Sequence, residues 1–279
     1  MENADLATLG RREWLLKTRA DLRALSSEAS AMPAYETISA RDFLHRHYAP
    51  NRPALIRAET AGWPALKLWT PDYLKAKIGS TKIEYQGSRN SDANYELMKQ
   101  RHRHRVGFDK FIDMALAEGA ANDVYVTAYN SRYNTSALAP LTQDLGFIDH
   151  ILERNVPNPH GMMWIGGGGT FTPLHHDLTN NLLVQIVGSK RIVLISPDEV
   201  TQLYNNHHVF SQILDVEKVD LTRFPATANL RVMRFDLMPG EALFIPIGWW
   251  HQVTSNDFSV SITYTNFRWR NNFHEGFPS

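Results

Sequence analysis

A histidine and an aspartate stand two residues apart in a segment with the character of a β-strand. They are His175 and Asp177, in the sequence Thr172-Pro-Leu-His-His-Asp177. Side chains at positions i and i+2 of a strand lie on the same face. An imidazole and a carboxylate on one face can take two adjacent positions around a metal ion. A second histidine would complete the two-histidine, one-carboxylate triad that binds Fe(II) and leaves three positions open.

The candidate for that second histidine is His251. It follows a strand-like run, a Pro/Gly turn and two tryptophans, in the segment Met238-Pro-Gly-Glu-Ala-Leu-Phe-Ile-Pro-Ile-Gly-Trp-Trp-His-Gln-Val253. The pair His207-His208 suits a metal less well, because adjacent strand residues diverge, and we expect it on the surface. His176 faces away from its two neighbours and is expected to be structural. The sequence therefore predicts one metal site made by His175, Asp177 and His251.

Composition limits the other possibilities. The chain has 279 residues, 43% of them hydrophobic, which is enough for one large core. It has 29 basic and 29 acidic residues, so its net charge of zero indicates no nucleic-acid or anionic-membrane partner. Cysteine is absent, which excludes disulfides, thiol catalysis and thiolate metal sites. No long apolar run or leader-like N-terminus is seen, so we expect a cytoplasmic protein.

The first part of the chain, residues 1–120, is mixed and mostly helical in pattern. Apolar residues at helical spacing predict an amphipathic helix over 11–29 that packs on the body or on a partner subunit. Further helices are predicted after Ser39 to Tyr48, after Thr70 to Gly79 and over 108–116, with strands over 53–57 and 82–86. His45 and His47 are expected on a helix surface. The basic run Arg101-His-Arg-His-Arg105 is interpreted as a solvated loop or helix face.

The second part, residues 121–270, has the alternation and turn signals of strands, and 271–279 form a tail. After a strand over 124–129 and a mostly helical connection over 141–153, we predict eight strands: 161–165, 170–177, 182–187, 191–195, 231–237, 242–245, 251–254 and 259–267. Eight short antiparallel strands suggest a jelly roll or small barrel whose mouth can hold a metal. We expect one globular unit, because no low-complexity linker separates the parts.

Several motifs, spread in order from about Phe43 to Trp269, resemble the JmjC and cupin-like Fe(II)- and 2-oxoglutarate-dependent oxygenases. Within this family, the motifs resemble those of the asparaginyl hydroxylase of hypoxia-inducible factor. The motifs are Pro64-Ala-Leu-Lys-Leu-Trp69, Thr172-Pro-Leu-His-His-Asp177, Gln185-Ile-Val-Gly-Ser-Lys-Arg191, Ile245-Pro-Ile-Gly-Trp-Trp-His251 and Ile262-Thr-Tyr-Thr-Asn-Phe-Arg-Trp269. The resemblance implies a mainly β fold, a double-stranded β-helix (jelly roll, cupin/JmjC type) surrounded by helices that are mostly N-terminal.

The resemblance also implies roles for individual residues. His175, Asp177 and His251 match the iron ligands, and Lys190 matches the residue whose ammonium group meets the distal carboxylate of 2-oxoglutarate. Without the resemblance, Lys190 would be interpreted as an exposed hairpin lysine. The remaining cosubstrate-binding residues it implies are Thr172, Tyr125, Asn181, Asn266, Trp164 and Met162. Tyr129 is an alternative to Tyr125, since it lies on the same alternating segment.

The implied reaction is hydroxylation of a C–H bond by O2, with 2-oxoglutarate as cosubstrate, on a peptide or protein side chain. Demethylation of N-methyl-lysine or N-methyl-arginine and hydroxylation of a small molecule are alternatives in the same enzyme class. An inactive cupin-like binding or scaffold protein is the alternative from another class. The segment over 205–215 departs from the asparaginyl hydroxylase, and that relative's C-terminal dimerisation helices have no counterpart before Ser279. Substrate and oligomeric state, monomer or homodimer, therefore stay open.

Overall fold

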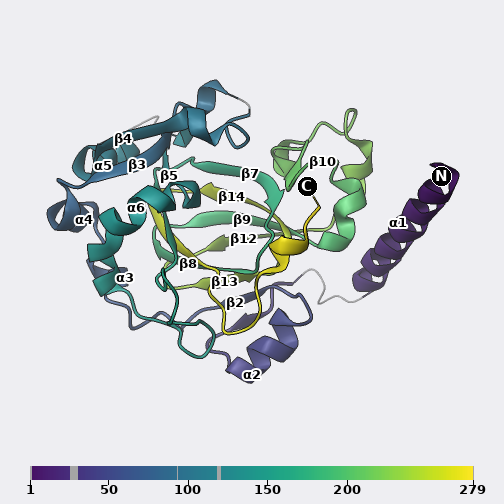
Figure 1. Cartoon of the computed structure of the whole chain (residues 1–279), viewed down its shortest axis with the longest axis horizontal. Coiled ribbons are helices and arrows are strands. Elements are labelled where there is room, and N and C mark those ends of the chain that lie inside the picture. Colours follow the sequence, from purple (N-terminus) through teal and green to yellow (C-terminus); the bar gives the residue numbers. More distant parts are fainter. Residues whose placement is uncertain (1, 26–30, 93, 118–120, 279) are drawn as a thin grey trace.

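Two facing β-sheets form the centre of the molecule in the computed structural model, which describes residues 2–25, 31–92, 94–117 and 121–278 (Figure 1). The larger sheet has nine strands in the order β1-β2-β13-β8-β15-β6-β5-β3-β4, and the smaller has six in the order β10-β11-β7-β14-β9-β12. The strands are β1 (Ala34–Tyr35), β2 (Ala54–Ile56), β3 (Lys82–Gly87), β4 (Arg103–Gly107), β5 (Val124–Val126), β6 (Met162–Gly166), β7 (Phe171–His176), β8 (Asn181–Val187), β9 (Lys190–Ile195), β10 (Asn205–His207), β11 (Phe210–Ser211), β12 (Val232–Leu237), β13 (Ala242–Ile245), β14 (Trp250–Ser255) and β15 (Ser259–Tyr264).

The eight strands predicted in the second part of the chain are confirmed as β6 to β9 and β12 to β15, with ends shifted by a few residues. They form the two sheets of a cupin-type jelly roll, as expected. Strands β10 and β11 were not predicted, because they are short and lie in a polar segment. The larger sheet also contains β1 to β4 from the first part of the chain, with β2 paired to β13 and β3 to β5.

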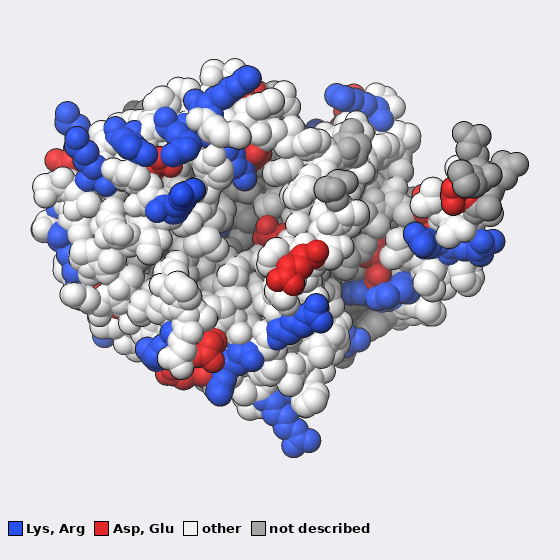
Figure 2. All heavy atoms as spheres, viewed as in Figure 1, with Lys and Arg blue, Asp and Glu red and all other residues white. Residues whose placement is uncertain are grey.

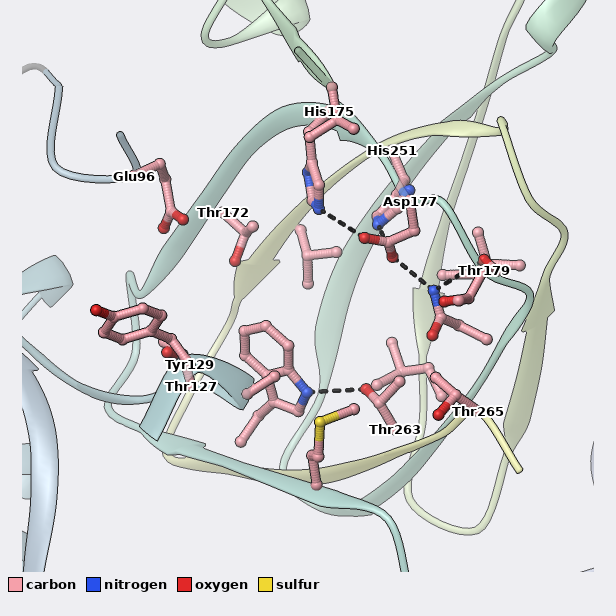
Figure 3. A pocket seen from close by; sticks show the side chains of 18 of the residues that line it. Glu96, Thr127, Tyr129, Thr172, His175, Asp177, Thr179, His251, Thr263 and Thr265 are labelled. Atoms are coloured by element: carbon pink, nitrogen blue, oxygen red, sulfur yellow. Dashed lines mark hydrogen bonds and ion pairs between the residues drawn. The ribbon is translucent and has the colours of Figure 1, made fainter. Parts of the chain in front are cut away.

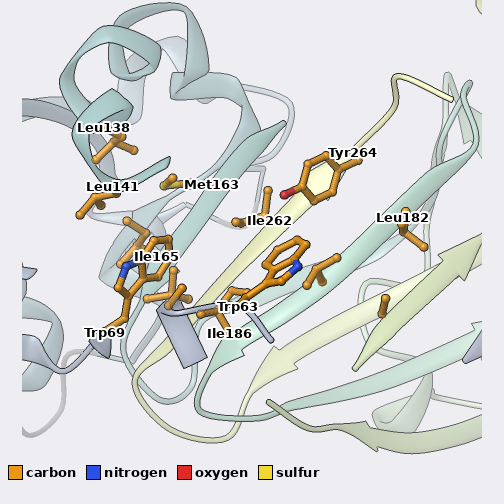
Figure 4. Close-up of a cluster of buried hydrophobic side chains, with 14 of the residues drawn as sticks. Trp63, Trp69, Leu138, Leu141, Met163, Ile165, Leu182, Ile186, Ile262 and Tyr264 are labelled. Carbon is orange, nitrogen blue, oxygen red and sulfur yellow. The ribbon is translucent and has the colours of Figure 1, made fainter. Parts of the chain in front are cut away.

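Strand β8 is covered on both faces, which explains its nearly continuous apolar sequence. Leu182, Val184 and Ile186 belong to the large core cluster between the nine-stranded sheet and the helices. Figure 4 shows Leu182 and Ile186 in this cluster, together with Trp63 and Trp69 of the helical layer. Leu183 points the other way, into the cluster between the two sheets. The alternation therefore leaves Asn181 and Leu183 facing the interior of the jelly roll, where both line the main cavity.

The α-helices after the first pack on the outer face of the nine-stranded sheet. The α-helices are α1 (Glu2–Ala24), α2 (Ala40–Phe43), α3 (Ala65–Leu68), α4 (Pro71–Ile78), α5 (Phe108–Leu116) and α6 (Ser131–Leu138). Ser39 and Thr70 cap α2 and α4 as predicted, each accepting a backbone N–H with its hydroxyl. The predicted strand over 124–129 ends at Val126, and helical structure follows in 131–144, earlier than the predicted 141–153. The helix predicted over 108–116 is confirmed as α5.

The surface placement predicted for His47 is wrong, whereas that for His45 is confirmed. Segment 44–48 is one π-helical turn that continues α2 and turns His47 inward. Its ring is 2% exposed and bonds to the carbonyl of Pro53 and the hydroxyl of Tyr35. The spacing of residues in an α-helix does not predict such a turn, because a π-turn shifts the following side chains around the helix axis.

Helix α1 lies at the edge of the molecule (Figure 1). It begins earlier than predicted, and residues 26–29 of the predicted helix lie outside the described residues. Its inner face contacts the body through Ala20 and through Arg19 and Arg23, which pair with the buried Asp198. Its outer apolar residues Trp14, Leu15 and Leu22 are exposed. None of the described helices is long and apolar enough to span a bilayer.

The interpretation of Arg101 to Arg105 as a solvated loop or helix face is wrong for residues 103–105, which form a strand. Residues 99–102 form a 3-10 turn, and Arg103 begins β4, the last strand of the larger sheet. The side chains of Arg101, Arg103 and Arg105 are nevertheless exposed to solvent, as expected.

Candidate metal and cosubstrate site

Strands β7 and β14 bring the three predicted metal ligands together. They pair antiparallel, with His175 directly opposite His251. Asp177 follows the end of β7, on the same face as His175. One ligand atom from each of the three residues lies within 4.8 Å of the others. Figure 3 shows the three side chains converging at the top of the cavity.

Backbone carbonyls orient both imidazole rings. Nδ1 of His175 lies 2.8 Å from the carbonyl oxygen of Pro173, and Nδ1 of His251 lies 3.0 Å from that of Trp249. A carbonyl oxygen only accepts, so each Nδ1 carries the proton and each Nε2 offers a lone pair. Both Nε2 atoms face Asp177, at 3.9 Å and 3.5 Å from its carboxylate oxygens. Two neutral nitrogen donors and one carboxylate are a donor set consistent with Fe(II).

Burial keeps His251 in its neutral form. Desolvation, together with the nearby His175, lowers the pKa of His251 to about 4, although Asp177 acts in the opposite direction. The imidazole is therefore unprotonated at neutral pH, as a metal ligand must be. Asp177 is held in turn by Asn181, whose amide nitrogen donates to Oδ2 at 2.6 Å.

The triad opens into a cavity of about 400 Å³ between the two sheets. Lys190, the first residue of β9, lies in its wall and is 2% exposed. The ammonium group donates to the Tyr125 hydroxyl at 3.1 Å and lies 5.4 Å from the centre of that ring. Among the described residues no carboxylate comes within 4.0 Å of it. A buried ammonium group without an anion is costly, so this wall is suited to bind one.

The other predicted cosubstrate residues line the same cavity, with one exception. Thr172, Tyr125, Asn181, Trp164 and Met162 are in its wall. The Trp164 indole N–H donates to Thr263 at 2.8 Å, which fixes the ring against the cavity (Figure 3). Asn266 does not line the cavity: its amide donates to the carbonyls of Glu153 and Pro159 and joins two loops. Tyr129, the alternative to Tyr125, also lines the cavity, but the Lys190 ammonium group bonds to Tyr125.

Several cavity residues were not predicted from the sequence, among them Glu96, Lys99, His208 and Phe210. Glu96 and Lys99 form an ion pair at 3.0 Å, and Glu96 also binds the buried Arg89 at 2.6 Å. Phe210 stacks near His175, with 5.9 Å between ring centres, and His208 lies at the exposed rim. None of them stands in a recognisable motif. His176 is structural as expected, with its ring 4.7 Å from that of Trp250.

Comparison with known proteins agrees with this architecture. A family model described as a cupin-like domain matches residues 40–275. Similar proteins include lysine-specific demethylase 8 of Xenopus tropicalis, 29% identical over 86% of this chain and 53% of that protein. Lysine-specific demethylase JMJ30 of Arabidopsis thaliana is 31% identical over 81% of this chain and 52% of its own length. The tRNA wybutosine-synthesizing protein 5 of Gallus gallus is 28% identical over 84% of this chain and 76% of its own length. The chain thus spans about half the length of the two demethylases.

Proposed function

Because this chain belongs to the cupin-like domain family, we propose that it is an Fe(II)- and 2-oxoglutarate-dependent oxygenase that hydroxylates a C–H bond of a peptide or protein side chain. His175, Asp177 and His251 would hold the iron. Iron bound there would supply the O2-dependent oxidation, with 2-oxoglutarate converted to succinate and CO2.

The observation that carries the proposal is the isolated ammonium group of Lys190 in the same cavity as the triad. A dicarboxylate fits this arrangement, since one end can neutralise Lys190 while the other reaches the metal. Tyr125 and Thr172 can donate hydroxyl hydrogen bonds to the carboxylate at the Lys190 end. Trp164, Met162 and Leu183 form an apolar wall that excludes water from the cosubstrate.

The residues of the chain therefore bind and orient the reactants. The carbonyls of Pro173 and Trp249 hold the two imidazole rings, and Asn181 holds one oxygen of Asp177. The side of the cavity with Glu96 and Tyr129 (Figure 3) is left for the substrate.

The experiment that tests the proposal is an assay of succinate release by the purified chain with Fe(II), 2-oxoglutarate and ascorbate. We expect succinate formation, increased by a true substrate, and a mass gain of one oxygen atom in a hydroxylated peptide. If the wild type retains no iron and forms no succinate, the scaffold alternative is supported instead.

N-demethylation is the second candidate, because two of the similar proteins are named lysine-specific demethylases. It begins with the same hydroxylation, here on an N-methyl group, and ends with loss of formaldehyde. Release of formaldehyde from N-methylated peptides, in the amount of succinate formed, would distinguish it. The name of a third relative refers to tRNA. A net charge of zero does not favour a nucleic acid as the substrate of this chain.

A further inference from the structure

A second concave site borders the cavity that holds the triad. This arginine groove has a volume of about 380 Å³ and is lined by Glu84, Arg103, Arg105, Tyr129, Arg132 and Tyr133. Tyr129 lines both the groove and the cavity. A ligand in the groove is therefore next to the entrance of the candidate active site.

Buried Glu84 holds two of the guanidinium groups in place. It is 3% exposed and accepts from Nε and Nη2 of Arg103 at 3.0 and 2.9 Å, and from the same atoms of Arg105 at 3.3 and 3.2 Å. Burial alone would raise the pKa of this carboxyl, but the bonds from Arg103 and Asn130 hold it below its usual range. Both arginines are thus ordered before any ligand binds, and each guanidinium has more N–H donors than the two that Glu84 accepts from.

The groove carries a net positive charge. Arg132 lies in its wall on α6, is exposed, and has no carboxylate within 4.0 Å among the described residues. Residues 99–105 contain four Lys and Arg and no acidic residue. Figure 2 shows blue side chains gathered over the region of β3 and β4 at upper left, next to the central hollow. A negatively charged ligand is therefore favoured here.

The groove also lies beside a free strand edge. β4 is the last strand of the larger sheet and pairs with β3 on one side only. No described strand pairs with its other side, so alternate N–H and C=O groups of β4 point away from the sheet. Such an edge can bind an extended peptide as an additional strand. Arg103 and Arg105 are two residues apart, which matches the alternation of side chains in such a peptide.

We propose that the arginine groove binds an extended, acidic segment of a protein substrate. The segment pairs with the outer edge of β4, its carboxylates contact Arg103, Arg105 and Arg132, and the residue to be modified enters the cavity past Tyr129. The inference rests on the proposed function, whose substrate class it specifies. The net charge of zero and the strand edge favour a peptide over a nucleic acid, which needs a wide basic surface.

The first experiment compares three short fluorescein-labelled probes by fluorescence anisotropy with the whole chain at low salt. The probes are a peptide of alternating Glu and Thr, its Gln-Thr counterpart and a single-stranded oligouridylate of the same net charge as the Glu-Thr peptide. We expect the Glu-Thr peptide to bind at least about tenfold more tightly than either other probe, since charge-assisted bonds to arginine are lost in the Gln-Thr peptide. Equal binding of the two peptides, or tighter binding of the oligonucleotide, would overturn the proposal.

The second experiment uses Arg132→Glu, with Arg41→Glu as its control. Both residues are exposed, and each is the second residue of its helix, α6 or α2. Arg132→Glu should weaken binding of the Glu-Thr peptide at least about tenfold, and Arg41→Glu should leave it unchanged. The same affinity in both variants would show that the peptide binds elsewhere.

The strand pairing has its own probe. N-methylation of alternate residues removes the N–H groups along one edge of a peptide but keeps every charge. Of the two Glu-Thr peptides methylated in alternate registers, one should lose affinity on the order of tenfold or more. If both bind like the unmethylated peptide, pairing with β4 is wrong.

These measurements need neither iron nor turnover, so they are independent of the proposed function. Peptide binding without succinate formation would leave the groove as a binding site and reject the oxygenase. Succinate formation without selective binding of the acidic peptide would support the oxygenase and reject the inference.

Discussion

The orientation of the two histidines in the proposed metal site depends on main-chain atoms. The carbonyls of Pro173 and Trp249 accept from Nδ1 and so fix which nitrogen each ring offers. Asp177 lies between the two Nε2 atoms and is half-exposed, so it belongs to the cavity mouth and not to the hydrophobic core. Its proposed role as a metal ligand can therefore be tested separately from any contribution to stability.

Asp177→Ala should abolish succinate formation while the protein stays folded. Loss of a direct ligand should cost more than the roughly 10- to 100-fold commonly seen when only a supporting residue is changed. We expect a melting temperature near that of the wild type in the absence of metal. Asp149→Ala, which removes an exposed carboxylate outside the cavity, serves as the control. Equal turnover in Asp177→Ala and the wild type would place the iron elsewhere.

Lys190→Met should weaken 2-oxoglutarate binding roughly 10- to 100-fold, because the distal carboxylate loses a charge-assisted bond while most of the side-chain volume is kept. The neighbouring Arg191 points to the other face of β9, towards Glu217 and Asp236, and provides a matched control. Titration calorimetry with both variants should show the loss in Lys190→Met alone. An unchanged affinity in Lys190→Met would exclude this lysine as the cosubstrate anchor.

Protonation of His47 should destabilise the fold at mildly acidic pH. Burial lowers the pKa of His47 below its ordinary value of 6.5. The unfolded chain therefore takes up this proton first as the pH falls below 6.5, and stability is lost in that range. Urea unfolding at pH 7.5 and pH 5.5 should show a smaller loss in His47→Gln than in the wild type. His45→Gln, at an exposed position two residues earlier, should behave like the wild type. An identical pH dependence in all three proteins would show that protonation of His47 does not destabilise the fold.

At the scale of elements, the β8–β9 hairpin sets the position of Lys190. Its turn passes through Gly188, whose φ of +64° suits glycine. The space beside it is filled, since a Cβ there would collide with Asp257 and with the carbonyl of Phe258. The turn, the start of β9 and the 255–258 loop are therefore packed as one unit.

Gly188→Ala should destabilise the protein by more than about 1–2 kcal/mol, the usual cost of a left-handed residue with a side chain. It should also weaken 2-oxoglutarate binding, because the displaced turn lies two residues before Lys190. Gly62→Ala is the control, since a Cβ there meets nothing within 4 Å. Urea midpoints and cosubstrate affinity for the two variants check this, and equal values in both would show that the turn tolerates a side chain.

Much of the second part of the chain could be predicted from sequence, because apolar alternation and turn residues agree there. The spacing of His175 and Asp177 and the position of His251 follow from such local patterns. Glu96 could not be found this way, because its place in the cavity is set by ion pairs with Arg89 and Lys99. β4 was missed because its side chains are mostly charged, and its strand conformation depends on pairing with β3.

At the scale of the whole molecule, the interior is divided by function. Apolar side chains fill the space between the larger sheet and the helices, and a second cluster around Trp249 fills one end of the jelly roll. The remaining end contains the cavity, and the polar groups that converge there come from both sheets. The triad is on the smaller sheet, and Tyr125 and Asn181 are on the larger one. The distance between the triad and these two residues therefore depends on how the two sheets pack.

The pairing of β2 with β13 also affects how the chain acquires its structure. Ala54–Ile56 are made early, whereas their partners in Ala242–Ile245 are near the other end of the sequence. Contacts so distant in sequence make folding slow and leave apolar strands uncovered in the meantime. During synthesis, Leu55 and Ile56 have no β13 to cover them until residue 242 has left the ribosome. Nascent chains shorter than this should therefore depend on chaperones, although the residues of β2 have already been synthesised.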